Sequence, residues 1–203
     1  MQYRSGWAVP EKDRHCFFAV LSEAPDLGSS LDLCKGFRTA IQAGGNIGIY
    51  PAALAQRFAR VYTVEPDAAN FAALQINTSN QQKIIARRAA FGKEPGRAAI
   101  DQIQPDNIGA HQIQPGDEFE VITIDSLGVT DCDLLQLDVE GSEHEALLGA
   151  IATIEASWPV ITLELKTLGE RYGYTDADTI NLLAGMGYEI ADRVNRDVIF
   201  THG

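Results

Sequence analysis

The chain has 203 residues, of which 45% are hydrophobic and 22% charged, and its formal net charge is −12. This length and composition are typical of one globular domain with a sizeable core, so we expect a single domain over residues 1–203. The excess of acidic residues argues against a nucleic-acid partner, because phosphate binding requires a basic surface.

Two further absences narrow the class of protein. No apolar run reaches membrane-spanning length, and the N-terminus lacks the basic-then-apolar order of a signal peptide. Cys16, Cys34 and Cys132 lack the paired spacing of a zinc site or a disulfide framework. We therefore expect a cytoplasmic protein with no membrane partner.

The N-terminal residues 1–36 predict a cap rather than part of the main sheet. A helix is expected over residues 11–23, ending at Ala24-Pro25, because the residue before a proline disfavours helical geometry. Residues 37–42 then predict a buried strand, followed by a glycine turn and a helix over residues 49–60. Tyr50, Leu54 and Phe58 form an apolar stripe on this helix.

The glycine turn predicts a nucleotide-type pocket. Without Cβ atoms a ligand can approach the backbone, and the N–H groups that open the next helix point toward it. The dinucleotide spacing G-x-G-x-x-G would require a glycine where the chain has Ala43. The chain instead offers Gly44, Asn46 and Gly48.

A second strand over residues 60–64 runs into Glu65-Pro66. The proline favours an extended backbone at Glu65, which holds the carboxylate at the tip of the strand. An acid about 20 residues beyond a glycine turn is well placed to accept hydrogen bonds from both hydroxyls of a ribose. The alternative, a solvated acid beside a turn, is less well supported when the two features occur together.

The alternation of strands and helices continues to residue 86 and predicts an α/β fold. Asp67 is expected to cap a helix ending near Asn77, and a third strand is expected over residues 83–86. The alternation of strands and helices stops over residues 96–124, where strand-like pieces are separated by turns at 105–107 and 115–117. This pattern predicts an inserted antiparallel hairpin or flap. His111 lies in this insertion and is expected at the surface.

Three carboxylates are expected at one edge of the sheet. A buried strand over residues 131–139 ends in Asp138 and Glu140, and a strand over residues 160–165 carries Glu164. In open parallel sheets this edge is where ligands bind, so these acids are candidates for a general base. Glu140 has an equally supported alternative role at the positive end of the following helix, which Ser142 and Glu145 are expected to open as a capping box.

The acids Asp131, Asp133, Asp138 and Glu140 resemble a magnesium-binding cluster in sequence, but no metal site is predicted. Asp131 and Asp133 belong to the same strand as Asp138 but stand at its opposite end. The last two strands, around Asn195, are expected to form an antiparallel pair.

Five segments of the sequence, taken in chain order, resemble the motifs of one known family. They are residues 42–48, 64–66, 89–92, 124–127 and 137–143. Over roughly residues 37–166 the chain resembles the FkbM family of S-adenosylmethionine-dependent methyltransferases. The resemblance implies a class I, Rossmann-like fold, with a mostly parallel seven-stranded sheet, an antiparallel final strand and helices on both faces. The catalytic core would span residues 37–203, behind a short N-terminal cap and with the inserted hairpin.

The resemblance also implies a cofactor, S-adenosyl-L-methionine, and its contacts. Gly44, Asn46 and Gly48 would border its methionine part, Glu65 would hold the ribose, residues around Arg88 and Ala89 would approach the adenine, and Asp138 would stand near the sulfonium. The full set of expected cofactor-binding residues is Gln42, Ala43, Gly44, Asn46, Gly48, Glu65, Pro66, Arg88, Ala89 and Asp138. The family motif usually begins with Asp, and Gln42 lacks that charge, so weaker cofactor binding is expected.

The implied activity is O-methylation of a sugar or another small hydroxylated metabolite, with a small molecule or glycan as the acceptor. Asp138, Glu140 and Glu164 are the candidate catalytic residues. Two alternatives stay open. An NAD-dependent oxidoreductase would have a similar turn and ribose acid, although Ala43 and the Asp138 segment argue against it. A binding module that has lost catalysis is compatible with Gln42.

Overall fold

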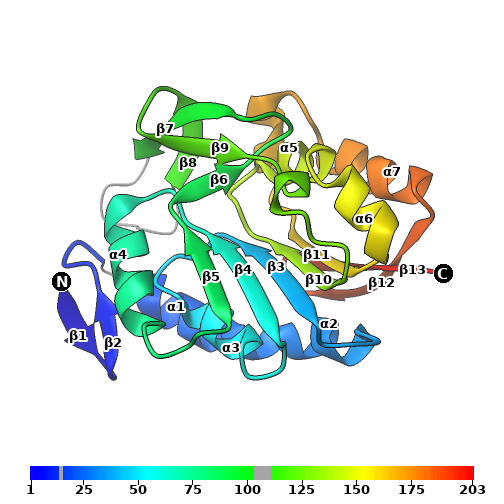
Figure 1. The fold of residues 1–203 in the computed structure, drawn as a ribbon. Helices are drawn as coiled ribbons and strands as arrows, with labels where there is room; N and C mark the ends of the chain where they lie inside the picture. Colours follow the sequence, from blue (N-terminus) through cyan, green and yellow to red (C-terminus); the bar gives the residue numbers. More distant parts are fainter. Residues whose placement is uncertain (14–15, 103–110) are drawn as a thin grey trace.

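A computed structural model, which describes residues 1–13, 16–102 and 111–203, shows a central sheet between two layers of helices (Figure 1). The strands of this seven-stranded sheet are, in spatial order, β12 (Tyr188–Val194), β13 (Asp197–His202), β11 (Val160–Glu164), β10 (Cys132–Leu137), β3 (Thr39–Ala43), β4 (Arg60–Val64) and β5 (Ile84–Arg87). The five strands from β11 to β5 are parallel, whereas β13 runs antiparallel to both β11 and β12. The parallel sheet and the reversed final strand therefore match the expectation.

Seven α-helices accompany the sheet in the described part of the chain. They are α1 (Cys16–Glu23), α2 (Leu27–Leu33), α3 (Ile49–Leu54), α4 (Ala68–Asn77), α5 (Glu143–Leu148), α6 (Ile151–Ser157) and α7 (Asp176–Gly185). Figure 1 shows α1, α2 and α3 on one face of the sheet and α5, α6 and α7 on the other. Among the described residues, no helix is both long and apolar enough to cross a bilayer.

The two faces of the sheet are apolar because consecutive residues of a strand point in opposite directions. Ile41 and Leu135 pack with α5, α6 and α7 on one face, while their neighbours Ala40 and Leu134 pack toward α2 and α3 on the other. Phe58 belongs to this second core and is fully buried. The continuous apolar runs of the central strands are thus explained by burial on both sides.

Two helices differ from the expected bounds. The helix after the glycine turn ends at Leu54 rather than residue 60, because the next turn tightens: the amide of Gln56 donates to the carbonyl of Ala53, and that of Arg57 to Leu54. The N-terminal α-helix ends at Glu23, directly before Ala24-Pro25 as expected, but residues 11–13 are not helical and α1 begins at Cys16. After α1 the chain passes through a 3₁₀ turn, η1 (Ala24–Asp26), into α2, and a small hairpin of β1 (Gln2–Arg4) and β2 (Trp7–Val9) precedes it.

The expected inserted hairpin is part of a second sheet. Four strands compose it in the order β6 (Ala89–Phe91), β9 (Phe119–Ile122), β7 (Gly96–Gln102) and β8 (His111–Pro115). β7 and β8 are antiparallel as expected, but β9 also pairs with β6 in parallel, which ties the hairpin to the segment after β5. The predicted turn at residues 105–107 lies outside the described residues.

One of the predicted helix caps is confirmed and another is wrong. The side chain of Asp67 accepts hydrogen bonds from the amides of Ala69 and Asn70, as expected of an N-cap. The capping box at Ser142 is wrong, because the Ser142 hydroxyl donates to the carbonyl of Val139 and makes no cap bond. The carboxylate of Glu143 instead accepts the amides of Val139 and Gly141.

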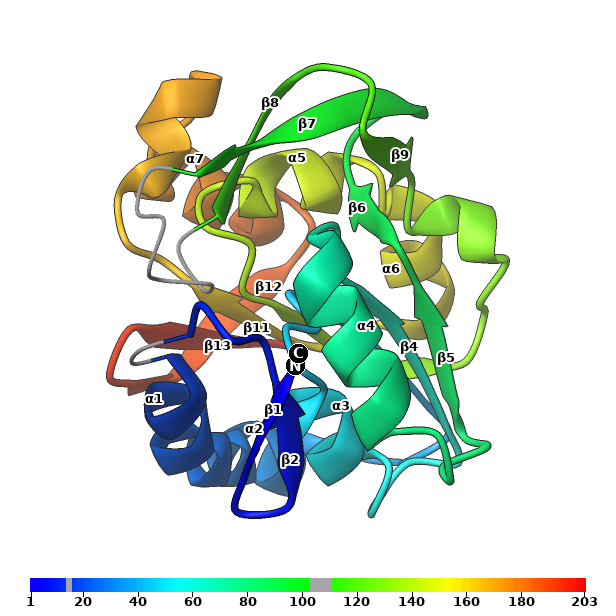
Figure 2. The ribbon, with the colours of Figure 1, turned by 90° about the vertical axis from the view of Figure 1, so that its left-hand side faces the viewer.

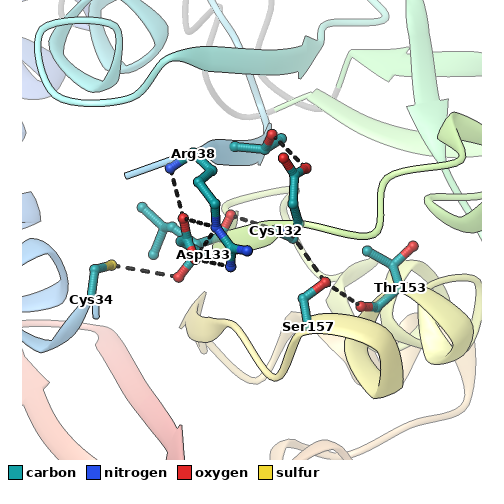
Figure 3. Close-up of polar contacts among 9 residues, drawn as sticks. Cys34, Arg38, Cys132, Asp133, Thr153 and Ser157 are labelled. Carbon is teal, nitrogen blue, oxygen red and sulfur yellow. Dashed lines mark hydrogen bonds and ion pairs between the residues drawn. The ribbon is translucent and has the colours of Figure 1, made fainter. Parts of the chain in front are cut away.

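The amino-terminal end of β10 holds its own polar network (Figure 3). Asp133 accepts hydrogen bonds from the backbone and guanidinium of Arg38, and Asp131 accepts one from the hydroxyl of Thr39. Cys132 is fully buried between them. The separation of these two acids from Asp138 is as the strand pattern predicted.

We predict that Gly44→Ala destabilises the protein far more than Gly173→Ala. Both glycines have positive φ, +81° and +89°, which costs a side chain about 1–2 kcal/mol. A Cβ at position 44 would also overlap the backbone carbonyl of Asp138, whereas one at position 173 meets nothing within 4 Å. Urea unfolding should give a loss on the order of 3–5 kcal/mol for Gly44→Ala. Equal losses for the two variants would contradict the close approach.

Candidate active site

The register of the parallel strands brings the ends of the strands to one level. Ala43 pairs with both Val64 and Leu137, and Leu137 pairs with Leu163. The residues that follow these positions, which are Gly44, Glu65, Asp138 and Glu164, therefore form a single rim at the carboxyl edge of the sheet.

A cavity of about 260 Å³ lies along this rim. Helix α1 closes it on one side and β8 on the other, and Figure 2 shows the two elements at opposite sides of the strand ends. Its lining residues are Cys16, Ala19, Val20, Glu23, Gly44, Asn46, Tyr50, Val64, Glu65, Pro66, Ala90, His111, Ile113, Asp138, Val139, Glu140, Glu164, Lys166 and Arg196.

The two ends of the cavity differ in chemistry. Near β4 and β6 the wall is largely apolar, with Pro66, Ala90 and Ile113. Near β10 and β11 it is charged, with the carboxylates described below and Lys166. From β5 to β11 the rim crosses four strand spacings, or roughly 19 Å. The site is therefore a long groove with one apolar and one ionic end.

Most of the predicted site residues lie in this wall. Gly44, Asn46, Glu65, Pro66, Asp138, Glu140 and Glu164 all line the cavity. Ala43, Gly48, Arg88 and Ala89 do not: Gly48 caps α3, and Arg88 is exposed and donates to the carbonyl of Pro66. Ala90, one residue beyond the predicted Ala89, takes its place in the wall.

Gln42 has a different place from the one expected. Its side chain is fully buried beneath the turn, where its amide donates to the carbonyl of Ala43 and its oxygen accepts a hydrogen bond from the Thr63 hydroxyl. A direct contact with a bound ligand would require this pair to open. Gln42 thus fixes β3 against β4 rather than facing the cavity.

Glu65 is held rigidly at the centre of the groove. One carboxylate oxygen accepts the amide of Asn46 at 2.8 Å, and the other accepts the amide of Asp67 at 2.9 Å. Burial raises the pKa of Glu65 to about 7, despite these two hydrogen bonds. The turn at Asn46 and the tip of β4 are therefore joined through one carboxyl group.

Lys166 is the centre of the ionic end. Its ammonium forms ion pairs with Glu164 and with Glu140, the latter at 3.1 Å, and lies 4.0 Å from Asp138. Burial works against its charge, but the neighbouring carboxylates outweigh burial and raise the pKa of Lys166. Oxygens of the three acids lie within 4.8 Å of one another, a spacing that a metal ion can bridge, and Lys166 already supplies a positive charge to them.

The pKa values of Asp138 and Glu164 shift in opposite directions. Burial, followed by a hydrogen bond with Glu164 and the charge of that residue, raises the pKa of Asp138 well above its usual range. Burial acts the same way on Glu164, but its hydrogen bonds with Asp138 and Lys166 outweigh burial and lower its pKa. Of this pair, Asp138 therefore holds a proton more readily than Glu164.

A second chamber of about 290 Å³ adjoins this ionic end. It shares Glu23, Tyr50, Asp138, Glu164 and Arg196 with the groove. Its remaining lining residues are Asp26, Val194, Asn195 and Asp197. Burial and the charges of Glu164, Asp26 and Glu23 raise the pKa of Asp197 to about 6.

Sequence reasoning missed several residues of the two cavities. His111, expected at the surface, has only 10% of its side chain exposed and lines the groove, so that expectation is wrong. Tyr50 also lines the groove, although the sequence assigned it only to the apolar stripe of its helix. The residues of α1 that line the groove belong to no motif that would indicate a binding site. Their roles depend on how distant segments fold over the rim, which no local pattern encodes.

Comparisons with known proteins identify the fold and the family of the chain. Among solved structures, the chain superposes on a methyltransferase FkbM from Methylobacillus flagellatus KT with a TM-score of 0.60 at 16% identity, over 93% of this chain and 55% of that one. It also superposes on precorrin 8W decarboxylase from Methanobacterium thermoautotrophicum (0.54, 12% identity, 97% and 100% covered). A third is magnesium protoporphyrin IX methyltransferase from Synechocystis PCC 6803 with bound SAM (0.52, 16%, 92% and 79%). The fold is thus one that methyltransferases use.

The family follows from the sequence itself. The model of the methyltransferase FkbM domain matches residues 42–190, so the chain belongs to the FkbM methyltransferase family. It spans about half the length of the Methylobacillus flagellatus FkbM structure. None of the curated proteins compared with the chain matches it.

We predict that the buried Glu65 makes stability depend on pH. Because its pKa is about 7 in the folded chain and 4.5 in a model peptide, the folded state binds more protons between these values. Stability contributed by the protonated carboxyl is thus complete below about pH 4.5 and is lost as the pH rises to about 7, by up to about 3 kcal/mol.

The check is urea unfolding of the wild type and Glu65→Gln from pH 4.5 to 7.5. The stability of the wild type relative to the variant should fall across this window, whereas the exposed Glu155→Gln variant should follow the wild type. Parallel profiles for wild type and Glu65→Gln would mean that burial does not raise the pKa of this carboxyl in the folded chain.

Proposed function

We propose that this chain is an S-adenosylmethionine-dependent methyltransferase that methylates a hydroxyl group of a sugar or another small polyhydroxylated metabolite. Membership of the FkbM family supports methyl transfer. The observation that carries the choice of acceptor is the acid-lined second chamber, which opens from the groove beside Asp138 and Glu164. The family and the chamber together define the proposal.

The groove fits the proposed cofactor in both shape and charge. Glu65 at its centre offers a carboxylate to the two ribose hydroxyls, and the apolar end beside Pro66 and Ala90 suits a purine base. The absence of a side chain at Gly44 leaves the backbone open where the methionine part would pass. At the far end Glu140 and Glu164 offer negative charge to the sulfonium and ammonium groups.

The second chamber fits a hydroxylated acceptor. Carboxylate and amide oxygens accept hydrogen bonds, and hydroxyl groups of a sugar donate them. Asp197, Asp26 and Asn195 supply such acceptors, with the Asn195 amide donating to Asp26 at 2.8 Å. An acceptor bound here would lie next to the Asp138–Glu164 pair.

The proposed chemistry divides between cofactor and chain. When bound, S-adenosylmethionine supplies a methyl group that is already activated by its positively charged sulfur. The chain orients the acceptor hydroxyl and receives its proton at the ionised carboxylate of Glu164, while protonated Asp138 holds that carboxylate in place. Lys166 stabilises the negative charge of Glu164 before the proton arrives.

The direct test incubates the protein with methyl-labelled S-adenosylmethionine and a panel of sugars, glycans and small alcohols. Transfer of label to a hydroxyl of one compound supports the proposal. Binding of the cofactor without transfer to any acceptor would favour the non-catalytic module. Binding of NAD in place of S-adenosylmethionine would favour the oxidoreductase.

We predict that Glu164→Gln lowers kcat by about 10²–10⁴-fold, because an amide cannot accept the proton. Asp138→Asn keeps an N–H donor toward Glu164 and should retain most of the activity that Asp138→Ala loses. Turnover should be measured at saturating S-adenosylmethionine, with cofactor affinity determined separately, and Glu155→Gln serves as the surface control. Unchanged kcat in Glu164→Gln would exclude its role as the base.

A further inference from the structure

One wall of the groove belongs to β8 of the four-stranded sheet rather than to the main sheet. His111 and Ile113 of β8 line the groove at the end that also holds Pro66 and Ala90. The hydroxyl of Tyr172, in the 3₁₀ helix η3 (Leu168–Tyr172), accepts the amide of Ile113 and donates to its carbonyl, each at 3.0 Å. These two bonds fix the start of β8 over the groove.

His111 is buried with an unused nitrogen. Its Nδ1 atom is inaccessible to solvent and makes no hydrogen bond. Oδ2 of Asp67 lies 3.6 Å from this nitrogen, just beyond hydrogen-bond distance, while Oδ1 of the same residue caps α4. The backbone amide of Asp67 donates to Glu65, so the residue facing His111 is tied directly to the acid at the centre of the groove.

The neighbouring carboxylate determines the tautomer of His111. Burial lowers the pKa of His111, and the opposing attraction of Asp67 does not reverse this, so the ring is neutral at pH 7. A neutral imidazole has one N–H and one bare nitrogen, and a carboxylate can only accept a hydrogen bond. The proton therefore belongs on Nδ1, facing Asp67, and Nε2 of this groove-lining residue is left as a bare acceptor.

We propose that His111 recognises the base of the nucleoside cofactor, with Nε2 accepting a hydrogen bond from the exocyclic amino group of adenine and Asp67 holding the tautomer that permits it. The inference rests on the proposed function, since it takes the nucleoside in the groove as given. A purine with an oxo group in place of the amino group would put an acceptor oxygen opposite Nε2, which is also an acceptor, so no hydrogen bond could form. His111 and Asp67 thus select the 6-amino base.

Calorimetric titration with S-adenosylhomocysteine and with its 6-oxo analogue, S-inosylhomocysteine, tests this selection. The wild type should bind the adenine compound at least about fivefold more tightly. His111→Phe should weaken adenine binding by about three- to tenfold and abolish the preference. His111→Gln, whose side-chain oxygen can accept the same bond, should keep it.

Asp67→Asn is a sharper test because it replaces a carboxylate, which can only accept a hydrogen bond from Nδ1, with an amide that can donate one to it. Asn is an equally good N-cap, so α4 should form normally, but its amide can donate to Nδ1 and move the proton to Nε2. The preference should then shift toward the 6-oxo compound. Nitrogen-15 spectra of labelled histidine should show Nε2 bare in the wild type and protonated in Asp67→Asn.

The outcomes separate this inference from the proposed function. If the wild type binds neither compound, the proposed function itself fails. If the wild type binds S-adenosylhomocysteine but His111→Phe keeps the same preference, or weakens both compounds equally, His111 does not read the base and the inference is overturned.

Discussion

The close approach of the turn after β3 to the end of β10 is the constraint on which the rest of the site depends. At Gly44 the backbone runs with positive φ so near the carbonyl of Asp138 that no side chain can be accommodated. The amide of Asp138 also donates to the carbonyl of Ala43. This contact brings the nucleotide-type turn and the first rim carboxylate into one groove, and the parallel register then places Glu65 and Glu164 on either side.

The charge distribution of the groove follows from this geometry. Four strand ends bring several carboxyl groups into a partly buried space, which would be unstable if all were ionised. Burial and Glu164 raise the pKa of Asp138, which favours its neutral form, and the ammonium of Lys166 lies among Asp138, Glu140 and Glu164. The carboxylate of Glu140, for which a role at the end of a helix was an alternative, accepts a hydrogen bond from the ammonium of Lys166 instead. The same arrangement leaves Glu164 as the ionised acid beside the second chamber.

The features that depend on local physics were predictable from sequence. The apolar runs predicted the central strands, the spacing of turn and acid predicted that Gly44 and Glu65 would share one site, and Asp67 was a recognisable cap. Features set by tertiary contact were not. The hairpin joined β6 in a separate sheet and His111 became part of the groove, because both depend on segments far away in sequence. The failed cap at Ser142 is instead local: its hydroxyl donates to the carbonyl of Val139, and Glu143 accepts the amides of Val139 and Gly141.

The central claim is that a sulfonium nucleotide lies along the rim with its ribose on Glu65 and its sulfur beside Asp138. A crystal structure of the protein with S-adenosylhomocysteine measures this directly. Both ribose hydroxyls should lie within hydrogen-bond distance of the Glu65 carboxylate, with the base between Pro66 and β8 and the sulfur facing the second chamber. A ligand bound elsewhere, or reversed so that its base meets Lys166, would contradict the central claim.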